Sequence, residues 1–269
     1  MTSPTGAPGR LLVVATPIGN LEDLSPRALA SLRDASLVLC EDTRRTGNLF
    51  SRYGLSTPRV SCHEHNEFRR IPEVLDRLAA GETLALVSDA GTPGVSDPGR
   101  LLVAAAAEAG FRVEPIAGPS AVAALLSVSG FPAILFSFLG FPPSRQGERA
   151  RWYARFAGRD ETRILFESPF RVVASLEEMA RAWGDPKVCL GRELTKLHEE
   201  LLRGPASAVA AILAKRPGIK GEIAVAAAPS TASALSEEEA PRSLPREEGE
   251  DEGPGQGEPA LDDGSITGE

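Results

Sequence analysis

The chain has 269 residues, of which 42% are hydrophobic and 25% charged, a composition typical of a globular protein with a substantial core. No run approaches 18 consecutive apolar residues, and the first residues lack the basic and apolar regions of a secretory signal, which argues against membrane insertion and secretion. The three cysteines are too few and too scattered for a disulfide framework, so we expect a cytoplasmic protein.

The formal net charge of −8 is distributed unevenly along the chain. Residues 231–269 contain twelve acidic residues, two basic residues and no aromatic residue, whereas residues 1–230 hold 27 basic and 25 acidic residues. Because a segment this poor in apolar side chains cannot offset the entropy of ordering, we expect an acidic disordered tail over 231–269 and a flexible leader over 1–9. The tail either solvates the protein or competes with RNA for its basic surface.

Strand-like and helix-like segments alternate along the remainder of the chain. Short apolar runs indicate strands, and Ser25-Pro26 has the pattern of an N-cap followed by a proline at the first helical position. The expected strands are, in chain order, 11–15, 36–40, 59–62, 84–87, 112–116, 135–138, 162–166, 187–190, 199–203 and 222–226. The expected helices are one beginning at Pro26, followed by 43–53, 71–80, 99–110, 120–129, 147–156, 172–183 and 206–214.

This order of elements predicts an α/β protein with two α/β domains. The regular alternation over residues 10–118 predicts a mostly parallel sheet with helices on both faces, and the less regular spacing over 119–230 predicts a mixed sheet. Ligands of open α/β sheets bind beyond the carboxyl ends of the strands. Loops rich in Gly, Pro, Ser and carboxylates follow the first five expected strands, at residues 16–20, 41–44, 63–67, 88–99 and 118–121.

The composition of these loops favours a ligand with amines, hydroxyls and a positive centre. Glycines allow close approach of the backbone, and prolines remove N–H donors, so carbonyls, hydroxyls and the Asp89 carboxylate remain as partners. Residues 1–230 contain neither the P-loop pattern nor the dinucleotide-binding glycine pattern. Each loop alone is compatible with an ordinary turn, but five at one sheet edge predict a ligand cleft.

Several motifs resemble those of the RsmI methyltransferases of bacteria. They are VATPIGNL (14–21), EDTR (41–44), HEHNE (63–67), VSDAGTPGVSDPG (87–99), PSA (119–121), ESP (167–169) and RELTKLHEE (192–200). The resemblance spans about residues 11–226 and implies the tetrapyrrole-methylase fold and 2′-O-methylation of one cytidine in the decoding region of 16S ribosomal RNA. The family usually has His after Glu-Ser-Pro, where this chain has Phe170.

The resemblance implies S-adenosylmethionine as cofactor, in a cleft between the two domains. The cofactor-binding residues that it implies are Pro17, Gly19, Asp89, Ala90, Gly91, Thr92, Pro93, Ser96, Pro119 and Ser120. We expect Asp89 to attract the cationic ligand or to accept from its amine or ribose groups. The alternative is a carboxylate that caps its own loop.

The implied reaction is an in-line displacement in which a ribose hydroxyl attacks the sulfonium methyl group. Positioning dominates such a reaction, and a base or a cation assists the neutral hydroxyl. We expect Lys196 either to lower the pKa of the hydroxyl electrostatically or to accept its proton, with Glu193 orienting Lys196 if the segment is helical. Glu167 is a second candidate base, with a structural hydrogen-bond acceptor as the alternative.

RNA contacts are expected from basic side chains and from the histidine-containing loop. The candidates are Arg44, His63, His65, Arg145, Arg149, Arg171 and Arg192. Solvated arginines and an ordinary hydrogen-bonded loop are the alternatives. No metal is expected, because the Cys62–His65 cluster lacks the second Cys/His pair of a zinc site. The resemblance also implies a homodimer acting on the small ribosomal subunit, without DNA or a membrane as partner.

Three functional classes are therefore compatible with the sequence. They are an RNA ribose methyltransferase, a tetrapyrrole methyltransferase of the same fold, and an RNA-binding module that has lost catalysis. The basic residues of 145–155 and 192–196 favour the first class over the second, since a macrocycle needs neither segment. Phe170 is the only feature that favours the third class.

Overall fold

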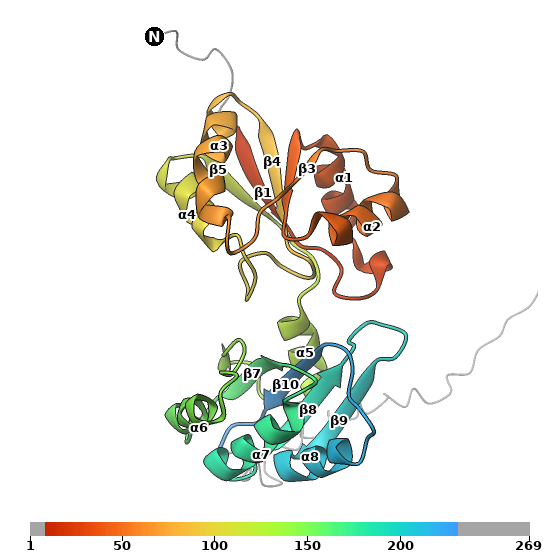
Figure 1. Ribbon diagram of the computed structural model, residues 1–269, viewed down its shortest axis with the longest axis vertical. Coiled ribbons are helices and arrows are strands. Elements are labelled where there is room, and N and C mark those ends of the chain that lie inside the picture. Colours follow the sequence, from red (N-terminus) through yellow and green to blue (C-terminus); the bar gives the residue numbers. More distant parts are fainter. Residues whose placement is uncertain (1–8, 231–269) are drawn as a thin grey trace, which may run out of the picture. The chain divides into compact units, whose positions relative to one another are not determined.

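The described part of the chain contains two five-stranded sheets, each with its own helices (Figure 1). The computed structural model describes residues 9–230, which belong to one compact unit. The predicted acidic tail and the predicted leader, apart from Gly9, lie outside the described residues. Within residues 9–230, none of the helices combines the length and apolar character needed to cross a bilayer.

The first sheet is parallel throughout, as the sequence predicts. Its strands lie in the order β3-β2-β4-β1-β5, and every neighbouring pair runs in the same direction. The inner strands are continuous apolar runs because both of their faces are covered. The bounds of the five strands are β1 (Arg10–Val14), β2 (Leu37–Cys40), β3 (Arg59–Ser61), β4 (Thr83–Val87) and β5 (Arg112–Ile116).

Alternate residues of these strands pack against two layers of helices. Leu12 and Val14 contact the core that includes α1 and α2, whereas Leu11 belongs to the core that includes α3 and α4. Figure 1 shows these two helix pairs on opposite sides of the sheet. The helical elements are η1 (Leu21–Asp23), α1 (Pro26–Asp34), α2 (Thr43–Tyr53), α3 (Glu67–Ala79) and α4 (Arg100–Glu108).

Local sequence accounts for several helix ends. Ser25 caps α1 by accepting a hydrogen bond from the Ala28 N–H at 3.1 Å, and Pro26 is the first helical residue, so the predicted start is confirmed. α2 ends at Gly54, whose φ of +63° a glycine adopts without strain. These ends depend on neighbours in the chain and therefore follow from the sequence.

The start of α3 depends instead on a contact with α4. Buried Glu67 accepts hydrogen bonds through Oε1 from the N–H groups of Gly99 at 3.1 Å and Leu102 at 2.9 Å. A carboxylate there satisfies two free donors of α4 and complements its dipole. α3 begins at Glu67, which places this carboxylate in the first turn of α3, whereas the sequence predicts a start at residue 71, beside Pro72.

The second sheet is mixed, which also confirms the prediction. Its order is β6-β7-β10-β8-β9, with β6 parallel to β7 and the other pairs antiparallel. Its strands are β6 (Phe136–Phe138), β7 (Thr162–Glu167), β8 (Lys187–Arg192), β9 (Glu200–Pro205) and β10 (Ile223–Ala227). Its helices are α5 (Ala121–Ser129), α6 (Gln146–Arg155), α7 (Val172–Trp183) and α8 (Ala206–Ala214).

Helices cover both faces of the second sheet as well. α6, α7 and α8 share one core with Leu165 and Val225, and α5 packs on the other face against Ile164 and Ala224. The chain passes from the first sheet to this layer between the end of β5 and the start of α5. A division into two domains near Gly118-Pro119 stays a prediction.

Candidate functional site

Hydrogen bonds join the loops that follow β1, β4 and β5. Thr16 and Gly91 exchange backbone hydrogen bonds of 2.8 and 3.0 Å, and the Thr92 hydroxyl donates to the Pro119 carbonyl at 3.3 Å. Gly91 has a φ of +81°, a conformation that a residue with a side chain rarely adopts. The loops therefore meet at one edge of the sheet, as the strand order predicts.

The turn between β8 and β9 reaches the loop after β1. Glu193 and Thr195 have φ values of 53° and 66°, so the turn is left-handed at two non-glycine residues. The Asn20 N–H donates to Oγ1 of Thr195 at 3.1 Å. A Cβ atom at Gly19 would lie 2.4 Å from Cγ of Lys196, so only glycine allows this approach.

Replacing Gly19 with alanine is expected to lower the free energy of unfolding by about 1–3 kcal/mol, because the turn carrying Lys196 must shift. Urea unfolding of the purified variant measures the change. Gly147→Ala is the matched control, since no atom lies within 4 Å of the added Cβ and alanine is the better helix former. Equal stability of the two variants would contradict the close approach.

Lys196 bridges two carboxylates at this turn. Its Nζ lies 2.8 Å from Oε1 of Glu193 and 2.9 Å from Oε2 of Glu222. Burial lowers the pKa of Lys196, but the hydrogen bonds to Glu193 and Glu222 outweigh it, and the pKa lies above its ordinary value. The predicted pairing of Glu193 with Lys196 is present, although a turn rather than a helix brings the two together. Of the two roles predicted for Lys196, the geometry favours the fixed cation over the proton acceptor.

A cavity of about 310 Å³ is lined by these loops and by residues of the second sheet, a size suited to a small molecule. Hydroxyl groups and three carboxylates lie among its apolar and aromatic walls. The described residues that line it include no Lys, Arg or His. The polar residues are Thr92, Ser96, Asp97, Ser120, Glu167, Ser168 and Glu222. This set suits a ligand with positive charge and donor groups better than a polyphosphate.

Half of the predicted cofactor-binding residues line this cavity. Those that do are Ala90, Gly91, Thr92, Ser96 and Ser120. Those that lie in the same loops but do not line it are Pro17, Gly19, Asp89, Pro93 and Pro119.

The second sheet contributes a wall of which sequence reasoning proposed only Glu167 as a site residue. Phe166 and Gly191 lie on β7 and β8, and Gly221 and Glu222 precede β10. A search beyond the carboxyl ends of the strands overlooks Gly221 and Glu222, because they precede β10. β10 runs antiparallel to both neighbours, which brings its amino end to the carboxyl ends of β7 and β8. The only local signal is Gly221, at a φ of +95° directly before a buried strand.

Comparison with known proteins connects this geometry to a family. The model for Tetrapyrrole (Corrin/Porphyrin) Methylases matches residues 10–210. The chain is 46% identical to Ribosomal RNA small subunit methyltransferase I of Xylella fastidiosa over 73% of this chain and 72% of the relative. It is 42% identical to the protein of the same name from Thermotoga maritima, over 81% of this chain and 97% of the relative. The chain belongs to this methyltransferase family.

Solved structures of other proteins share the fold of this methyltransferase. Diphthine synthase superposes with a TM-score of 0.61 at 15% identity, over 82% of this chain and 90% of the other. Uroporphyrin-III-C-methyltransferase from Thermus thermophilus superposes with a TM-score of 0.58 at 20% identity, over 83% of this chain and 96% of the other. At such identities the likeness shows the fold alone, and it confirms the predicted fold class.

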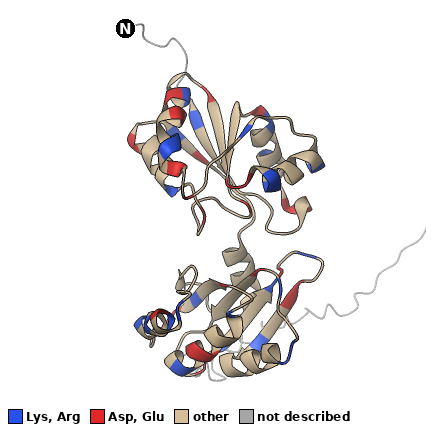
Figure 2. Ribbon diagram, viewed as in Figure 1, with Lys and Arg blue, Asp and Glu red and all other residues tan. Residues whose placement is uncertain are grey.

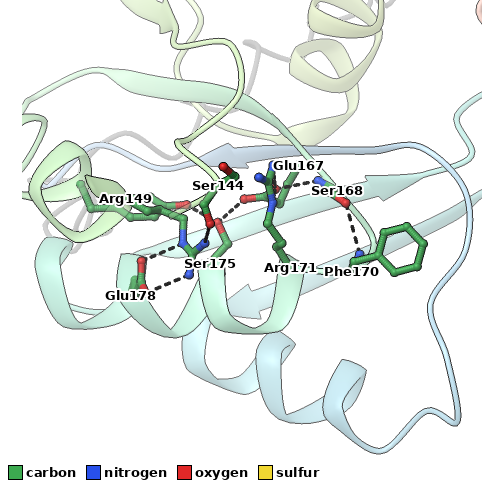
Figure 3. A network of polar contacts seen from close by, with 9 residues as sticks. Ser144, Arg149, Glu167, Ser168, Phe170, Arg171, Ser175 and Glu178 are labelled. Atoms are coloured by element: carbon green, nitrogen blue, oxygen red, sulfur yellow. Dashed lines mark hydrogen bonds and ion pairs between the residues drawn. The ribbon is translucent and has the colours of Figure 1, made fainter. Parts of the chain in front are cut away.

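Glu167 of this methyltransferase lies in a buried hydrogen-bond network (Figure 3). Its carboxylate accepts from the Ser168 N–H at 2.7 Å, from Nε of Arg171 at 3.1 Å and from the Ser175 hydroxyl. The Ser175 hydroxyl also contacts the Tyr153 hydroxyl at 2.6 Å. So many donors to one carboxylate favour the structural alternative, in which Glu167 holds the loop that carries Phe170.

The Asp89 carboxylate is likewise occupied, in this case by partners from another loop. One carboxylate oxygen accepts from the Asp42 N–H at 3.0 Å, and the other lies 3.4 Å from Nε of Arg45. These contacts join the loop after β4 to the loop after β2. Asp89 therefore joins two loops outside the cavity lining, whereas the predicted alternative was a bond to its own turn, and its predicted role in cofactor binding stays a prediction.

The structure corrects the prediction for Arg149. Its guanidinium is 5% exposed and makes a two-pronged ion pair with Glu178 at 2.8 and 3.0 Å, so it is not available to a phosphate (Figure 3). The error arises because α6 carries both basic and acidic positions (Figure 2), and the sequence alone does not show which face packs on α7. Arg145, on the same segment, is 83% exposed.

The other predicted RNA contacts are scattered over the surface loops. Arg44 is 89% exposed beside Asp42, Arg171 pairs with Glu167, and Arg192 pairs with Glu200. The rings of His63 and His65 lie 6.0 Å apart. No group of three or more metal-ligating side chains occurs among residues 9–230.

Proposed function

We propose that this protein transfers a methyl group from S-adenosylmethionine to the 2′-hydroxyl of one cytidine in the decoding region of 16S ribosomal RNA. The observation that carries the proposal is the 41–46% identity to relatives named Ribosomal RNA small subunit methyltransferase I, over most of the chain. The substrate is the 16S rRNA of the small ribosomal subunit, which places the protein in the cytoplasm. A homodimer is proposed on the family resemblance alone.

The chemistry of the cavity fits the proposed cofactor. S-adenosylmethionine supplies a methyl group on a positively charged sulfur. The carboxylates of Asp97 and Glu222 favour a cation in the cavity, and the hydroxyls of Thr92, Ser96 and Ser120 are suited to its amine, carboxylate and ribose groups. The absence of basic side chains from the described lining supports a cationic ligand over a phosphorylated one.

The turn between β8 and β9 has the groups needed to assist the ribose hydroxyl. Lys196 is held at the edge of the cavity through Glu222, which lines it. As a fixed cation, Lys196 stabilises the negative charge that develops on the attacking oxygen. Glu193 positions Lys196, because its Oε1 also accepts from the Glu222 N–H at 2.9 Å and so cannot rotate freely.

Exposed cations outside the cavity serve the RNA backbone. Arg44 and Arg145 have most of their side-chain surface free, so they are suited to phosphate contacts. Arg171 and Arg192 form ion pairs with Glu167 and Glu200, so they stabilise the loops that carry these residues instead of binding phosphates. In this proposal the exposed arginines bind RNA and the residues at the cavity carry out the chemistry.

Transfer of a tritiated methyl group from S-adenosylmethionine to purified small subunits that lack the modification tests the proposal. We expect label at a single decoding-region cytidine, mapped as a 2′-O-methyl group. Label on a porphyrinoid and none on RNA would favour the tetrapyrrole alternative. Binding of RNA and cofactor without transfer to either acceptor would favour a non-catalytic module.

A further inference from the structure

Two large apolar side chains stand almost fully in solvent on loops beside the cavity. Phe170 and Leu197 are each 92% exposed. Phe170 directly follows two residues of the cavity lining, Ser168 and Pro169, in the loop after β7. Leu197 lies in the turn between β8 and β9, shortly after Leu194 of the same lining. A single exposed apolar residue is ordinary, but two that flank one cavity indicate a surface that a ligand covers.

The register of the second sheet places the two loops on either side of the start of β10. Ile223, the first residue of β10, pairs with Glu167 on one side and with Arg192 on the other. Because neighbouring strands lie about 4.8 Å apart, the two loops leave the sheet about 10 Å from each other. The segment that carries Lys220 enters the sheet between them.

Hydrogen bonds hold the turn that carries Phe170. The Arg171 N–H donates to the Ser168 carbonyl at 3.0 Å, which closes a turn over residues 168–171 with a proline at its second position. The Phe170 N–H donates to Oγ of Ser168 at 3.3 Å, and the Glu167 carboxylate accepts from the Ser168 N–H. Figure 3 shows the Phe170 ring directed away from this network. A ring on so fixed a backbone loses little entropy when a ligand covers it.

A cation accompanies the ring outside the cavity. Phe170 and Lys220 both lie beyond the same end of the β7–β10 pairing, whose last pair is Glu167 with Ile223. Lys220 is exposed and forms no ion pair within residues 9–230. An exposed aromatic ring together with a free cation fits a nucleotide, whose base stacks on the ring and whose phosphate pairs with the charge.

We propose that Phe170 stacks on the base of the cytidine that is methylated, with Lys220 beside its phosphate. This assignment rests on the methyl transfer to RNA proposed above. A nucleotide whose ribose enters the cavity leaves its helical stack, and its base loses the neighbours on which it stacked. The base is joined to the carbon next to the one that carries the 2′-hydroxyl, so a ribose at the cavity brings its base to the adjacent loop. Phe170 is thus a positioning residue.

Phe170→Ala and Phe170→Tyr test the stacking through single-turnover methyl transfer at increasing concentrations of unmodified small subunits. We expect Phe170→Ala to raise the half-saturating concentration about 5–150-fold, with a smaller effect on the maximal rate. Phe170→Tyr keeps the ring and should stay within about twofold of the wild type. A fall in the maximal rate alone would overturn the assignment, because Phe170 would then act on the chemical step.

Ile134→Ala is the matched control, because it removes another almost fully exposed apolar side chain, one that is 96% exposed. β6 runs parallel to β7, and its first residue pairs with Thr162 at the start of β7. Ile134, which precedes β6, therefore lies at the opposite edge of the sheet from Phe170. We expect Ile134→Ala to match the wild type, and a loss equal to that of Phe170→Ala would contradict a specific role for the ring.

The salt dependence of binding to unmodified, protein-free 16S rRNA separates the ring from the cation. Lys220→Gln should lower the slope of log affinity against log salt by about 1, because one phosphate contact is lost. Lys215→Gln, at an exposed position at the end of α8, should leave the slope unchanged. Phe170→Ala should weaken binding by the same factor at low and high salt, since stacking involves no ion pair. Equal slopes for Lys220→Gln and the wild type would overturn the phosphate contact.

The outcomes separate this assignment from the proposed function. A wild-type protein that transfers no methyl group to RNA contradicts the proposed function. A wild type that transfers, together with a Phe170→Ala variant of equal half-saturating concentration, overturns the stacking alone. Three further results for Phe170→Ala would also overturn it: weaker binding of S-adenosylmethionine in calorimetry, a changed oligomeric state in ultracentrifugation, or an effect on subunits that is absent with protein-free 16S rRNA. The ring would then cover the cofactor, a second copy of the chain or a ribosomal protein.

Discussion

Replacing Lys196 with alanine is expected to lower the rate of methyl transfer by about 10²–10³-fold, the loss typical of removing one preorganised electrostatic contact. Nζ of Lys196 holds Glu193 at 2.8 Å and Glu222 at 2.9 Å, so the variant loses the cation and leaves two carboxylates facing each other. Single-turnover transfer to small subunits, with cofactor affinity measured separately, determines whether the loss lies in the chemical step.

Lys215→Ala is the matched control, because it removes an exposed lysine at the end of α8. The raised pKa of Lys196 adds a second check, because Lys196 keeps its proton at neutral and mildly alkaline pH, so its deprotonation should not raise the wild-type rate in that range. A wild-type rate that rises as Lys196 loses its proton at mildly alkaline pH would show that Lys196 is not the fixed cation proposed here. A Lys196→Ala variant as fast as Lys215→Ala would show the same.

Replacing Glu178 with alanine is expected to lower the free energy of unfolding by about 3–5 kcal/mol, because it leaves the buried Arg149 guanidinium without its carboxylate. In a domain of this size the loss corresponds to a fall of about 6–20 °C in Tm. Calorimetry of the purified variant measures it. Both side chains are 5% exposed, so added salt should change the effect little.

Glu177→Ala, one position earlier on α7 and exposed, provides the control and should change Tm by far less. The double replacement Arg149→Met with Glu178→Leu should recover most of the loss, since a buried ion pair is often equalled by packed apolar side chains. Equal destabilisation by Glu177→Ala and Glu178→Ala would contradict the role of the pair.

Much of the fold follows from local patterns in the sequence. The continuous apolar runs of β1, β2 and β4 indicate strands covered on both faces, and the parallel sheet follows from their alternation with helices. Ser25 and Gly54 act through neighbours in the chain, so helix ends near them were predictable. The convergence of the loops after β1, β4 and β5 also follows, because parallel strands end at one edge.

The details of the site depend on contacts that no local pattern reports. Glu222 reaches the cavity because β10 runs antiparallel to β7 and β8, and strand direction in a mixed sheet is decided by packing. The carboxylate of Asp89 is occupied by partners in the loop after β2. The carboxylate of Glu167 is occupied by its own loop and by Ser175 of α7. A motif therefore locates such residues at the site without showing which of them are free.

The sequence by itself determined the order of elements and the edge where the loops meet, since these depend on short-range periodicity and turn chemistry. The motif that carries Lys196 was found through its resemblance to a family. Only the tertiary structure decided that Arg149 is buried against α7, that α3 begins at Glu67, and that Asp97 and Glu222 line one cavity. Burial and charge at a side chain are sums over neighbours distant in the chain, and those neighbours are assigned only when the helices and sheets pack.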